Sequence, residues 1–264
     1  MKTILITGAA GGMGRATVDL FAAQGYHVFA LDRVATPAGE RITPIVADLT
    51  DEVSVRKAVV SVAQVAQKLD AIIHFAGIYM LDSLIEMPAE AYDRIFDINV
   101  RGVYLVNKYF FPFLKEGGRI LITTSELAPL DPLPFTGIYA ITKEALDKYA
   151  YSLRMELQLL GITVSVLRAG AVDTGMIGAS LSALDAFCER TKLYSCNAER
   201  FKRIVNGVES RRIKPEKIAQ KTFKIVSKSK PRFAYSVNRN PLLLILNALP
   251  KRFQLWIIRV ILKK

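Results

Sequence analysis

The feature that most constrains the fold of this chain is a glycine-rich turn near its first residue. The apolar run Lys2–Thr7 leads into the turn, and apolar residues at helical spacing follow over Gly14–Gly25. A strand, a tight turn and a helix are therefore expected in that order. Backbone amides of such a turn can face a phosphate at the helix N-terminus, whereas a tight turn without any ligand would use the same residues. The candidate phosphate-binding residues of the turn are Gly8, Gly11, Gly12, Met13 and Gly14.

The rest of the chain repeats this alternation of short apolar runs and helical periodicity. Runs that are apolar throughout are typical of strands buried on both faces. The sequence therefore predicts a single doubly wound α/β (Rossmann) domain, with a mostly parallel seven-stranded sheet and helices on both faces. The expected strands are Lys2–Thr7, His27–Leu31, Ile42–Ala47, Ala71–Ala76, Arg119–Thr124, Thr163–Arg168 and Arg232–Val237. The expected helices cover Gly14–Gly25, Asp51–Leu69, Ala89–Leu114, Ile138–Leu160 and Lys214–Ser227.

The predicted dinucleotide-binding and catalytic domain spans residues 1–240, an ordinary size for one α/β domain. Within it, Gly175–Gly207 is less regular than the rest of the chain. An insertion after the carboxyl end of a strand lies beside the ligand crevice of such a sheet. We therefore expect residues 175–210 to form a substrate lid, and residues 241–264 to form a separate basic, apolar C-terminal tail.

Four further side chains are candidates for chemistry. Asp32 ends the second expected strand, where an acid can accept hydrogen bonds from both hydroxyls of an adenosine ribose. Ser125 follows a strand and so lies at the carboxyl edge of the sheet, where ligands bind. Tyr139 and Lys143 share one face of a helix, where the ammonium would lower the tyrosine pKa towards the range of a general acid or base. Taken singly, each has a simpler explanation as a turn residue or a solvated helix pair.

Together these residues resemble the short-chain dehydrogenase/reductase family. The resemblance covers residues 1 to about 237. It includes Thr7-Gly8-x-x-x-Gly12-x-Gly14, Asp32, Asp48-Leu49, Asn99, Ser125 and Tyr139-x-x-x-Lys143 in the order and spacing of the family.

The resemblance implies a role for each catalytic candidate. Tyr139 would exchange the proton and Ser125 would hydrogen-bond the substrate oxygen. Lys143 would hold the nicotinamide ribose and tune Tyr139, while Asn99 would support a proton-relay water. Implied cofactor contacts are Gly8, Gly11, Gly12, Met13, Gly14, Asp32, Arg33, Asp48, Leu49, Ala76, Gly77, Tyr139, Lys143, Gly170, Val172 and Thr174.

Two segments depart from the family pattern. His74-Phe75-Ala76-Gly77 stands where the family usually has Asn-Asn-Ala-Gly, and Ala169-Gly170 stands where it usually has Pro-Gly. Neither departure removes a catalytic group. We expect His74 to contribute hydrogen bonds behind the site rather than to act as an acid or base.

These residues lead to one leading hypothesis and two alternatives. The chain is expected to be an NAD(H)-dependent oxidoreductase that interconverts an alcohol and its carbonyl on a hydrophobic substrate, such as a steroid, a retinoid or a lipid. Asp32 favours NAD because its charge would repel the 2′-phosphate of NADP, and Arg33 leaves NADP open because a guanidinium pairs with phosphate. The alternatives are a non-catalytic dinucleotide-binding sensor at a membrane surface, and an epimerase of the related extended family, which would need a larger sugar-nucleotide domain.

The net charge of +12 is confined to one end of the chain. Residues 211–264 contain 15 Lys and Arg against one acid, whereas residues 1–210 contain 21 bases and 23 acids. Because the basic residues alternate with large apolar ones, we expect no nucleic-acid partner. Cys188, Cys196 and two histidines suggest neither a disulfide framework nor a metal site. The apolar run before the glycine turn is too short for a signal peptide, so a cytoplasmic protein is expected.

The tail has two explanations. It is interrupted by Pro250 and by charges, and is therefore unlike the run of about 20 apolar residues that spans a bilayer. Arg252, Arg259 and Lys263 share one helical stripe and leave a wide apolar face, which favours a helix lying on an anionic membrane surface. The alternative is a helix that packs over the substrate pocket or against another subunit. We also expect the protein to be a homo-oligomer.

Overall fold

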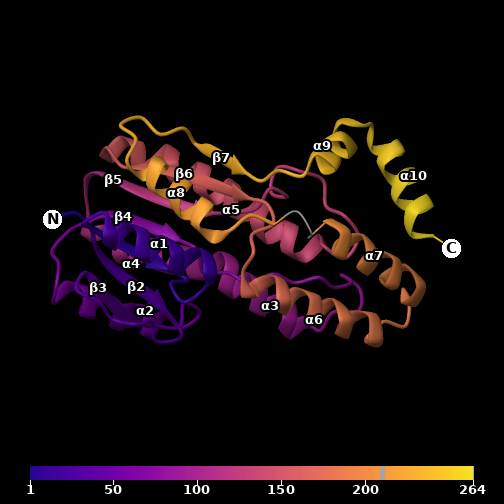
Figure 1. The fold of residues 1–264 in the computed structure, drawn as a ribbon, viewed down its shortest axis with the longest axis horizontal. Coiled ribbons are helices and arrows are strands. Elements are labelled where there is room, and N and C mark those ends of the chain that lie inside the picture. The colour runs from indigo at the N-terminus through magenta and orange to yellow at the C-terminus, as the bar shows by residue number, and fades with distance from the viewer. Residues whose placement is uncertain (209–211, 264) are drawn as a thin grey trace.

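The computed structural model describes residues 1–208 and 212–263, and it contains one parallel sheet. Its strand order is β3-β2-β1-β4-β5-β6-β7, and every pairing between neighbours is parallel. This confirms the predicted doubly wound Rossmann sheet (Figure 1). The strands are β1 Thr3–Thr7, β2 His27–Asp32, β3 Ile42–Val46, β4 Leu69–His74, β5 Leu114–Thr123, β6 Thr163–Ala169 and β7 Ala234–Val237.

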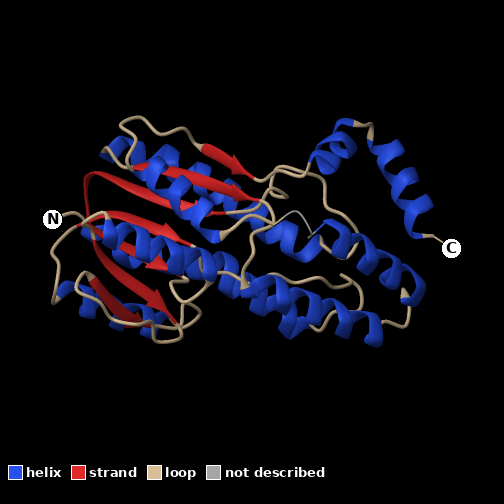
Figure 2. Ribbon diagram, viewed as in Figure 1, coloured by secondary structure: helices blue, strands red, loops and turns tan. Residues whose placement is uncertain are grey.

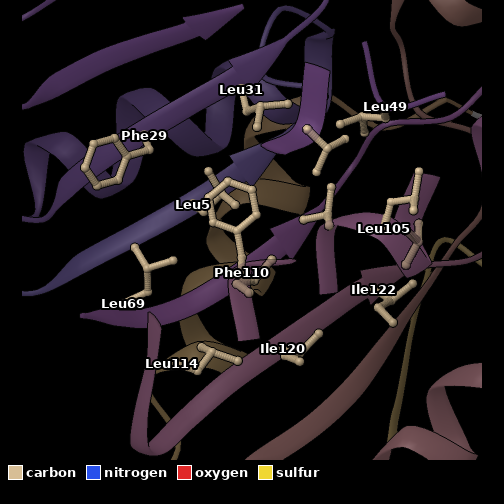
Figure 3. Close-up of a cluster of buried hydrophobic side chains, with 14 of the residues drawn as sticks. Leu5, Phe29, Leu31, Leu49, Leu69, Leu105, Phe110, Leu114, Ile120 and Ile122 are labelled. Carbon is tan, nitrogen blue, oxygen red and sulfur yellow. The ribbon is translucent and has the colours of Figure 1, made fainter. Parts of the chain in front are cut away.

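Helices cover both faces of this sheet because the strand side chains alternate between two apolar clusters. On one face Leu5, Phe29 and Ile72 pack against helices α2, α4 and α5 (Figure 3). On the other face Ile4 and Ile6 pack against α1 and α8. Ile4, Leu5 and Ile6 are all fully buried, as expected for a central strand of a parallel sheet. The helices on the two faces are α1 Gly12–Ala23, α2 Glu52–Ala63, α4 Gly102–Phe110, α5 Gly137–Leu157 and α8 Pro215–Val226.

The order of the strands places a crevice at one edge of the sheet. From β1 the chain winds outward through β2 to β3, and it then returns to pair β4 on the other side of β1. Loops after β1 and β4 therefore diverge, which opens a crevice at their carboxyl ends. In Figure 2 the strand arrowheads point towards the end of the molecule that holds the helices α6 Gly175–Arg190, α7 Ser195–Val208, α9 Pro241–Ala248 and α10 Lys251–Leu262, which Figure 1 labels. Most of the candidate residues belong to loops or helices at this edge, and Asp32 is the last residue of β2.

The segment predicted to be irregular is helical. It forms α6 Gly175–Arg190 and α7 Ser195–Val208, while residues 209 and 210 of the predicted lid lie outside the described residues. Leu184, Phe187 and Phe201 turn inward and form a small apolar cluster with Leu81 and Leu262, which are distant in sequence. These contacts bury apolar side chains of both helices.

The predicted helix Ala89–Leu114 is divided. It consists of α3 Ala89–Phe96, a π-helical turn over Asp97–Arg101, α4, and a 3₁₀ turn over Phe111–Phe113. The strand β5 then begins at Leu114, five residues before the predicted Arg119. A further 3₁₀ turn, Gln158–Leu160, ends α5.

The C-terminal tail forms two helices, α9 Pro241–Ala248 and α10 Lys251–Leu262, which are separated at Pro250. Ile258 and Leu262 of α10 pack into the apolar cluster beneath α6 and α7. The amide of Asn197 on α7 donates a hydrogen bond to the Leu262 carbonyl at 2.6 Å. None of the helices within residues 1–208 and 212–263 combines the length and apolar character needed to cross a bilayer.

Candidate active site

The glycine turn brings the ends of three strands together. Gly8 has a φ of +69°, and a Cβ there would lie 2.5 Å from the Ala76 amide nitrogen after β4. A Cβ on Gly12 would lie 2.7 Å from Cγ2 of Thr174 after β6. A Cβ on Gly14 would approach the Gly8 carbonyl oxygen to 2.0 Å. The turn therefore requires glycine for its own packing, whether or not a ligand binds.

The same turn also fits an anion. The N-cap of α1 is Gly11, which has no side chain to satisfy the free N–H groups of the first helical turn, and this first turn contains no acidic residue. The turn, together with Phe75, Thr174 and Gly175, encloses a cavity of about 270 Å³. An open concavity lined by helix N–H groups suits the pyrophosphate of a dinucleotide.

At the outer end of this crevice, Asp32 supports the turn. Its Oδ2 atom accepts a hydrogen bond from the Ala10 amide at 2.9 Å, and its Oδ1 atom accepts one from the Val34 amide at 3.2 Å. The Asp48 carboxylate accepts two hydrogen bonds from Thr50, which together with the nearby Arg33 charge lower the pKa of Asp48.

Leu49, by contrast, is buried in the core (Figure 3). It packs on the face of the sheet covered by α2 and α4, so its predicted cofactor contact is not brought to the crevice.

The three central candidates meet at the carboxyl end of β5. Tyr139 and Lys143 project from α5, and the hydroxyls of Ser125 and Tyr139 share a hydrogen bond. The ammonium of Lys143 donates to the Thr123 carbonyl at 3.5 Å and lies 5.5 Å from the centre of the Tyr139 ring. All three side chains are buried.

Burial changes the pKa values of this pair in opposite directions. Loss of solvent raises the pKa of Tyr139 to about 12; the hydrogen bond from Ser125 opposes this rise and the charge of Glu126 adds to it. Burial lowers the pKa of Lys143 to about 8. The predicted lowering of the Tyr139 pKa by Lys143 is therefore wrong for the protein without ligands, because the cost of burying a phenolate is the larger effect.

Asn99 is held in the π-helical turn and is fully buried. Its side chain donates to the Ile78 carbonyl at 3.0 Å and to the Thr142 hydroxyl at 3.1 Å, and accepts from the Ile78 amide at 2.8 Å. A Cβ on Gly77 would lie 3.1 Å from Oδ1 of Asn99 and 3.4 Å from Nζ of Lys143. Gly77 therefore leaves open the space between these two side chains. Nothing in the sequence pattern signals the π-helical turn, which is a feature often found at functional sites.

Ser125, Tyr139 and Lys143 line a cavity of about 200 Å³ next to the glycine turn. The predicted cofactor residues Met13, Gly77, Gly170, Val172 and Thr174 line the same cavity. Sequence reasoning missed its apolar wall, which includes Phe75, Ile78, Leu127, Leu133, Phe201, Ile204, Val205 and Leu243. Apolar residues after β5 and in α7 and α9 could have been assigned to this wall only if the positions of those elements had been known.

Behind the cavity, His74 is buried and neutral. Its Nε2 atom lies 2.9 Å from Oδ1 of Asn107, and burial lowers its pKa to about 4. This agrees with the expected hydrogen-bonding role.

The position of Gly170 requires glycine for a steric reason, because a Cβ there would lie 1.9 Å from the Asn238 carbonyl oxygen.

The fold and the crevice are those of a Rossmann-type dinucleotide-binding protein. The sequence profile of the family described as short chain dehydrogenase matches residues 2–184. The chain therefore belongs to the short-chain dehydrogenase/reductase family, whose members are oxidoreductases.

Individual relatives agree with this assignment. A 3-ketodihydrosphingosine reductase of Bacteroides thetaiotaomicron is 27% identical over 252 residues, which cover 95% of this chain and 92% of that protein. Oxidoreductase UcpA of Escherichia coli is 32% identical over 186 residues, covering 66% of this chain and 71% of that protein.

Solved structures show the same fold. A 3-ketoacyl-(acyl-carrier-protein) reductase from Brucella melitensis in complex with NADH matches with a TM-score of 0.74 and 26% identity, covering 89% of this chain and 96% of that one. A short chain dehydrogenase family protein from Francisella tularensis matches with a TM-score of 0.75 and 22% identity, covering 90% of this chain and 97% of that one.

Proposed function

We propose that this protein is an NAD(H)-dependent oxidoreductase that interconverts an alcohol and its carbonyl on a hydrophobic, lipid-like substrate. The observation that carries the proposal is the buried group of Ser125, Tyr139 and Lys143 in the wall of one apolar cavity that adjoins the glycine turn. A Rossmann protein that only sensed a dinucleotide would have no use for this group. For this reason we favour an enzyme over the sensor.

The proposed chemistry assigns one task to each side chain. In reduction, Tyr139 donates its proton to the carbonyl oxygen, and Ser125 donates a hydrogen bond to the same oxygen. The charge of Lys143 stabilises the phenolate that remains on Tyr139, and Asn99 supports the water that returns a proton. The nicotinamide, when bound, supplies the hydride in this direction and accepts it in the reverse.

The proposed cofactor is NAD, with its pyrophosphate on the glycine turn and its adenosine ribose on Asp32. The carboxylate of Asp32 is already oriented by the Ala10 and Val34 amides, so its position is fixed before a ligand binds. Arg33 lies near Asp48, because the charge of Arg33 lowers the pKa of the Asp48 carboxyl. The guanidinium therefore already has an acidic neighbour and does not need the 2′-phosphate of NADP as its partner. This favours NAD over NADP.

The lipid-like substrate is inferred from the cavity wall. The loops after β4 and β5 together with α7 and α9 contribute eight large aliphatic and phenylalanine side chains to the lining. An apolar cavity with few polar groups selects an apolar ligand and orients it at those groups. The name of the Bacteroides relative, a 3-ketodihydrosphingosine reductase, also supports reduction of a ketone on a lipid-like molecule. We assign α6 and α7 the role of a lid, because Phe201, Ile204 and Val205 of α7 cover this cavity.

We further propose that the tail rests on an anionic membrane surface. Ile258 and Leu262 of α10 face the protein, whereas Phe253, Trp256 and Val260 are more than half exposed on the opposite side. Arg252, Arg259 and Lys263 lie beside this exposed apolar stripe, where they would meet lipid headgroups. Leu243 of the neighbouring helix α9 lines the substrate cavity, so substrate could pass from the lipid to the site.

Turnover of a panel of substrates tests the reaction. The purified protein would be mixed with NADH and long-chain ketones, steroid ketones, retinal, sugars and polar keto acids, and NADH consumption would be followed. We expect turnover of the apolar ketones and none of the sugars or keto acids. Preference for polar substrates would overturn the substrate class, and no turnover of any carbonyl with NADH or NADPH would overturn the reaction.

A further inference from the structure

Glu126 places a carboxylate in the wall of the apolar cavity, and the proposed proton transfer does not use it. It directly follows Ser125, and its backbone amide donates to the Ala169 carbonyl at 3.0 Å, which fixes the loop against β6. Its side chain is half-buried and lines the same cavity as Ser125 and Tyr139. Its charge raises the pKa of Tyr139, so it opposes formation of the phenolate rather than assisting it.

The surroundings of Glu126 satisfy only part of this carboxylate. Its Oε2 atom accepts a hydrogen bond from the Asn240 amide at 2.6 Å, where α9 begins. A Cβ on Gly170 would lie 3.0 Å from Oε1 and 1.9 Å from the Asn238 carbonyl oxygen, so Oε1 lies beside the backbone of Gly170 and Asn238. Burial raises the pKa of Glu126, and the nearby charge of the solvent-exposed Arg239 only partly offsets this. Anchoring the start of α9 would need an acceptor, but not a negative charge.

A carboxylate in an apolar cavity is costly without a partner, and it binds strongly to a cation that enters the same cavity. We propose that Glu126 binds a protonated amine carried by the substrate beside the reacting carbon, so that the substrate class is long-chain amino ketones and amino alcohols. The alkyl chain would then lie along Phe201, Ile204 and Leu243. This inference rests on the proposed function, because the amine is positioned relative to the carbon that Tyr139 and Ser125 address.

Binding to a matched pair of ligands tests the inference. The two ligands are a long-chain secondary alcohol with an amino group on the carbon next to the carbinol, and the same alcohol without the amine. Their dissociation constants would be measured by calorimetry on the complex with NAD. We expect the wild-type protein to bind the amino alcohol about 10- to 100-fold more tightly, the effect of a hydrogen bond to a charged group.

Two variants locate the source of this preference. Glu126→Gln keeps an acceptor for the Asn240 amide and removes the charge, so the preference for the amine should disappear while affinity for the plain alcohol stays the same. Glu144→Gln makes the same change on the exposed side of α5, next to Lys143 in sequence but outside the cavity, and should leave the preference unchanged.

Three other outcomes would overturn the inference. Equal wild-type affinities, or a preference that persists in Glu126→Gln, would show that the carboxylate does not select an amine. Loss of both ligands in Glu126→Gln would show that Glu126 only holds α9 in place. If the amine preference depends on Glu126 but neither alcohol is oxidised, this inference stands and the proposed reaction fails.

Discussion

The Nζ atom of Lys143 lies 5.5 Å from the centre of the Tyr139 ring, one helical turn away on α5. Both side chains are buried, and burial favours the neutral form of each. With pKa values of about 12 for Tyr139 and about 8 for Lys143, both groups carry their protons at neutral pH. The pair is therefore prepared to donate a proton from Tyr139, the direction needed for carbonyl reduction.

Replacement of Tyr139 by phenylalanine should remove most turnover and leave cofactor binding almost unchanged, because it deletes the proton donor and little surface. General acid–base catalysis contributes about 10²- to 10⁴-fold, and we expect a loss of kcat in this range. Tyr151→Phe, at an exposed position of the same helix, is the control and should retain activity. A Tyr139→Phe enzyme within about threefold of wild type would contradict the assigned role.

The choice of cofactor should depend on Asp32. The wild-type protein is expected to bind NAD more tightly than NADP, because the carboxylate accepts ribose hydrogen bonds and repels a 2′-phosphate. Asp32→Asn keeps an acceptor for the Ala10 amide and removes the charge, so it should reduce the ratio of NADP to NAD dissociation constants by about tenfold or more. Tighter wild-type binding of NADP, abolished by Arg33→Gln, would show that Arg33 dominates instead.

A partly buried ion pair links the catalytic edge to the core. Asp147 on α5 pairs with Arg168 on β6. Its Oδ1 atom also accepts a hydrogen bond at 2.9 Å from the hydroxyl of Thr124, the residue directly before Ser125. Removal of one partner of a buried pair costs about 3–5 kcal/mol. Because Arg168 remains 22% exposed, we expect Arg168→Met to lower the free energy of unfolding by an amount near the lower end of that range.

Urea denaturation measures this loss, and the double variant Asp147→Leu with Arg168→Met is its control. The double variant should recover most of the stability, because it leaves no unpaired buried charge. If the single and double variants lose equal stability, packing of the two stems rather than their charges holds these elements together.

The stability of the fold should fall as the pH is lowered through the range set by His74. Its pKa is about 4 in the folded protein against 6.5 unfolded, so between these values the unfolded chain binds more protons than the folded one. The contribution is fully present above pH 6.5 and is progressively lost as the pH falls towards 4, by about 3 kcal/mol in total. His74→Asn, the residue usual in the family, should remove this part of the pH dependence in urea titrations. An unchanged profile in that variant would assign the dependence to other groups.

Much of the fold and the site could be predicted because the signals are local. Strands buried on both faces appear as continuous apolar runs, as Ile4, Leu5 and Ile6 illustrate. The glycine turn is also recognisable, since Gly8 and Gly14 occupy positions where a Cβ would collide with backbone. The spacing of Tyr139 and Lys143 places them on one helical face without any knowledge of the sheet.

Other features depend on contacts between distant parts of the chain. Phe187 on α6 and Leu262 at the end of α10 belong to one cluster, and this contact joins segments that are about 75 residues apart in the sequence. The spacing of Tyr139 and Lys143 along the helix could not predict whether the pKa of Tyr139 is raised or lowered. Burial of Tyr139 by other elements raises this pKa. The position of Glu126 beside the start of α9 is likewise a property of the assembled fold.

The tail provides a final prediction, and the structure decides how to test it. Removal of residues 241–264 would uncover the apolar cluster that Ile258 and Leu262 complete, so truncation would mix membrane binding with loss of folding. Substitutions on the exposed side avoid this problem. Phe253, Trp256 and Val260 are 59%, 62% and 58% exposed, and their insertion would contribute at most about 1.5–3 kcal/mol each. Arg252, Arg259 and Lys263 would add about 1 kcal/mol each on anionic lipid.

We therefore expect the full chain to float with anionic vesicles and much less with neutral ones, and raised salt to weaken the binding because basic residues near the headgroups are screened. Phe253→Ser with Trp256→Ser should strongly weaken flotation on both lipids, since most of the insertion energy is lost. Arg252→Gln with Arg259→Gln should mainly reduce the preference for anionic lipid. Unchanged thermal unfolding would verify that both variants keep α10 in place.

If the full chain stays with the unbound protein on both lipids, the exposed stripe is not a membrane surface. The oligomer size of Phe253→Ser with Trp256→Ser would then be measured by sedimentation. A smaller oligomer than in the wild type would identify the exposed stripe as the contact of the expected homo-oligomer, because subunits held together by an apolar stripe dissociate when the stripe is made polar.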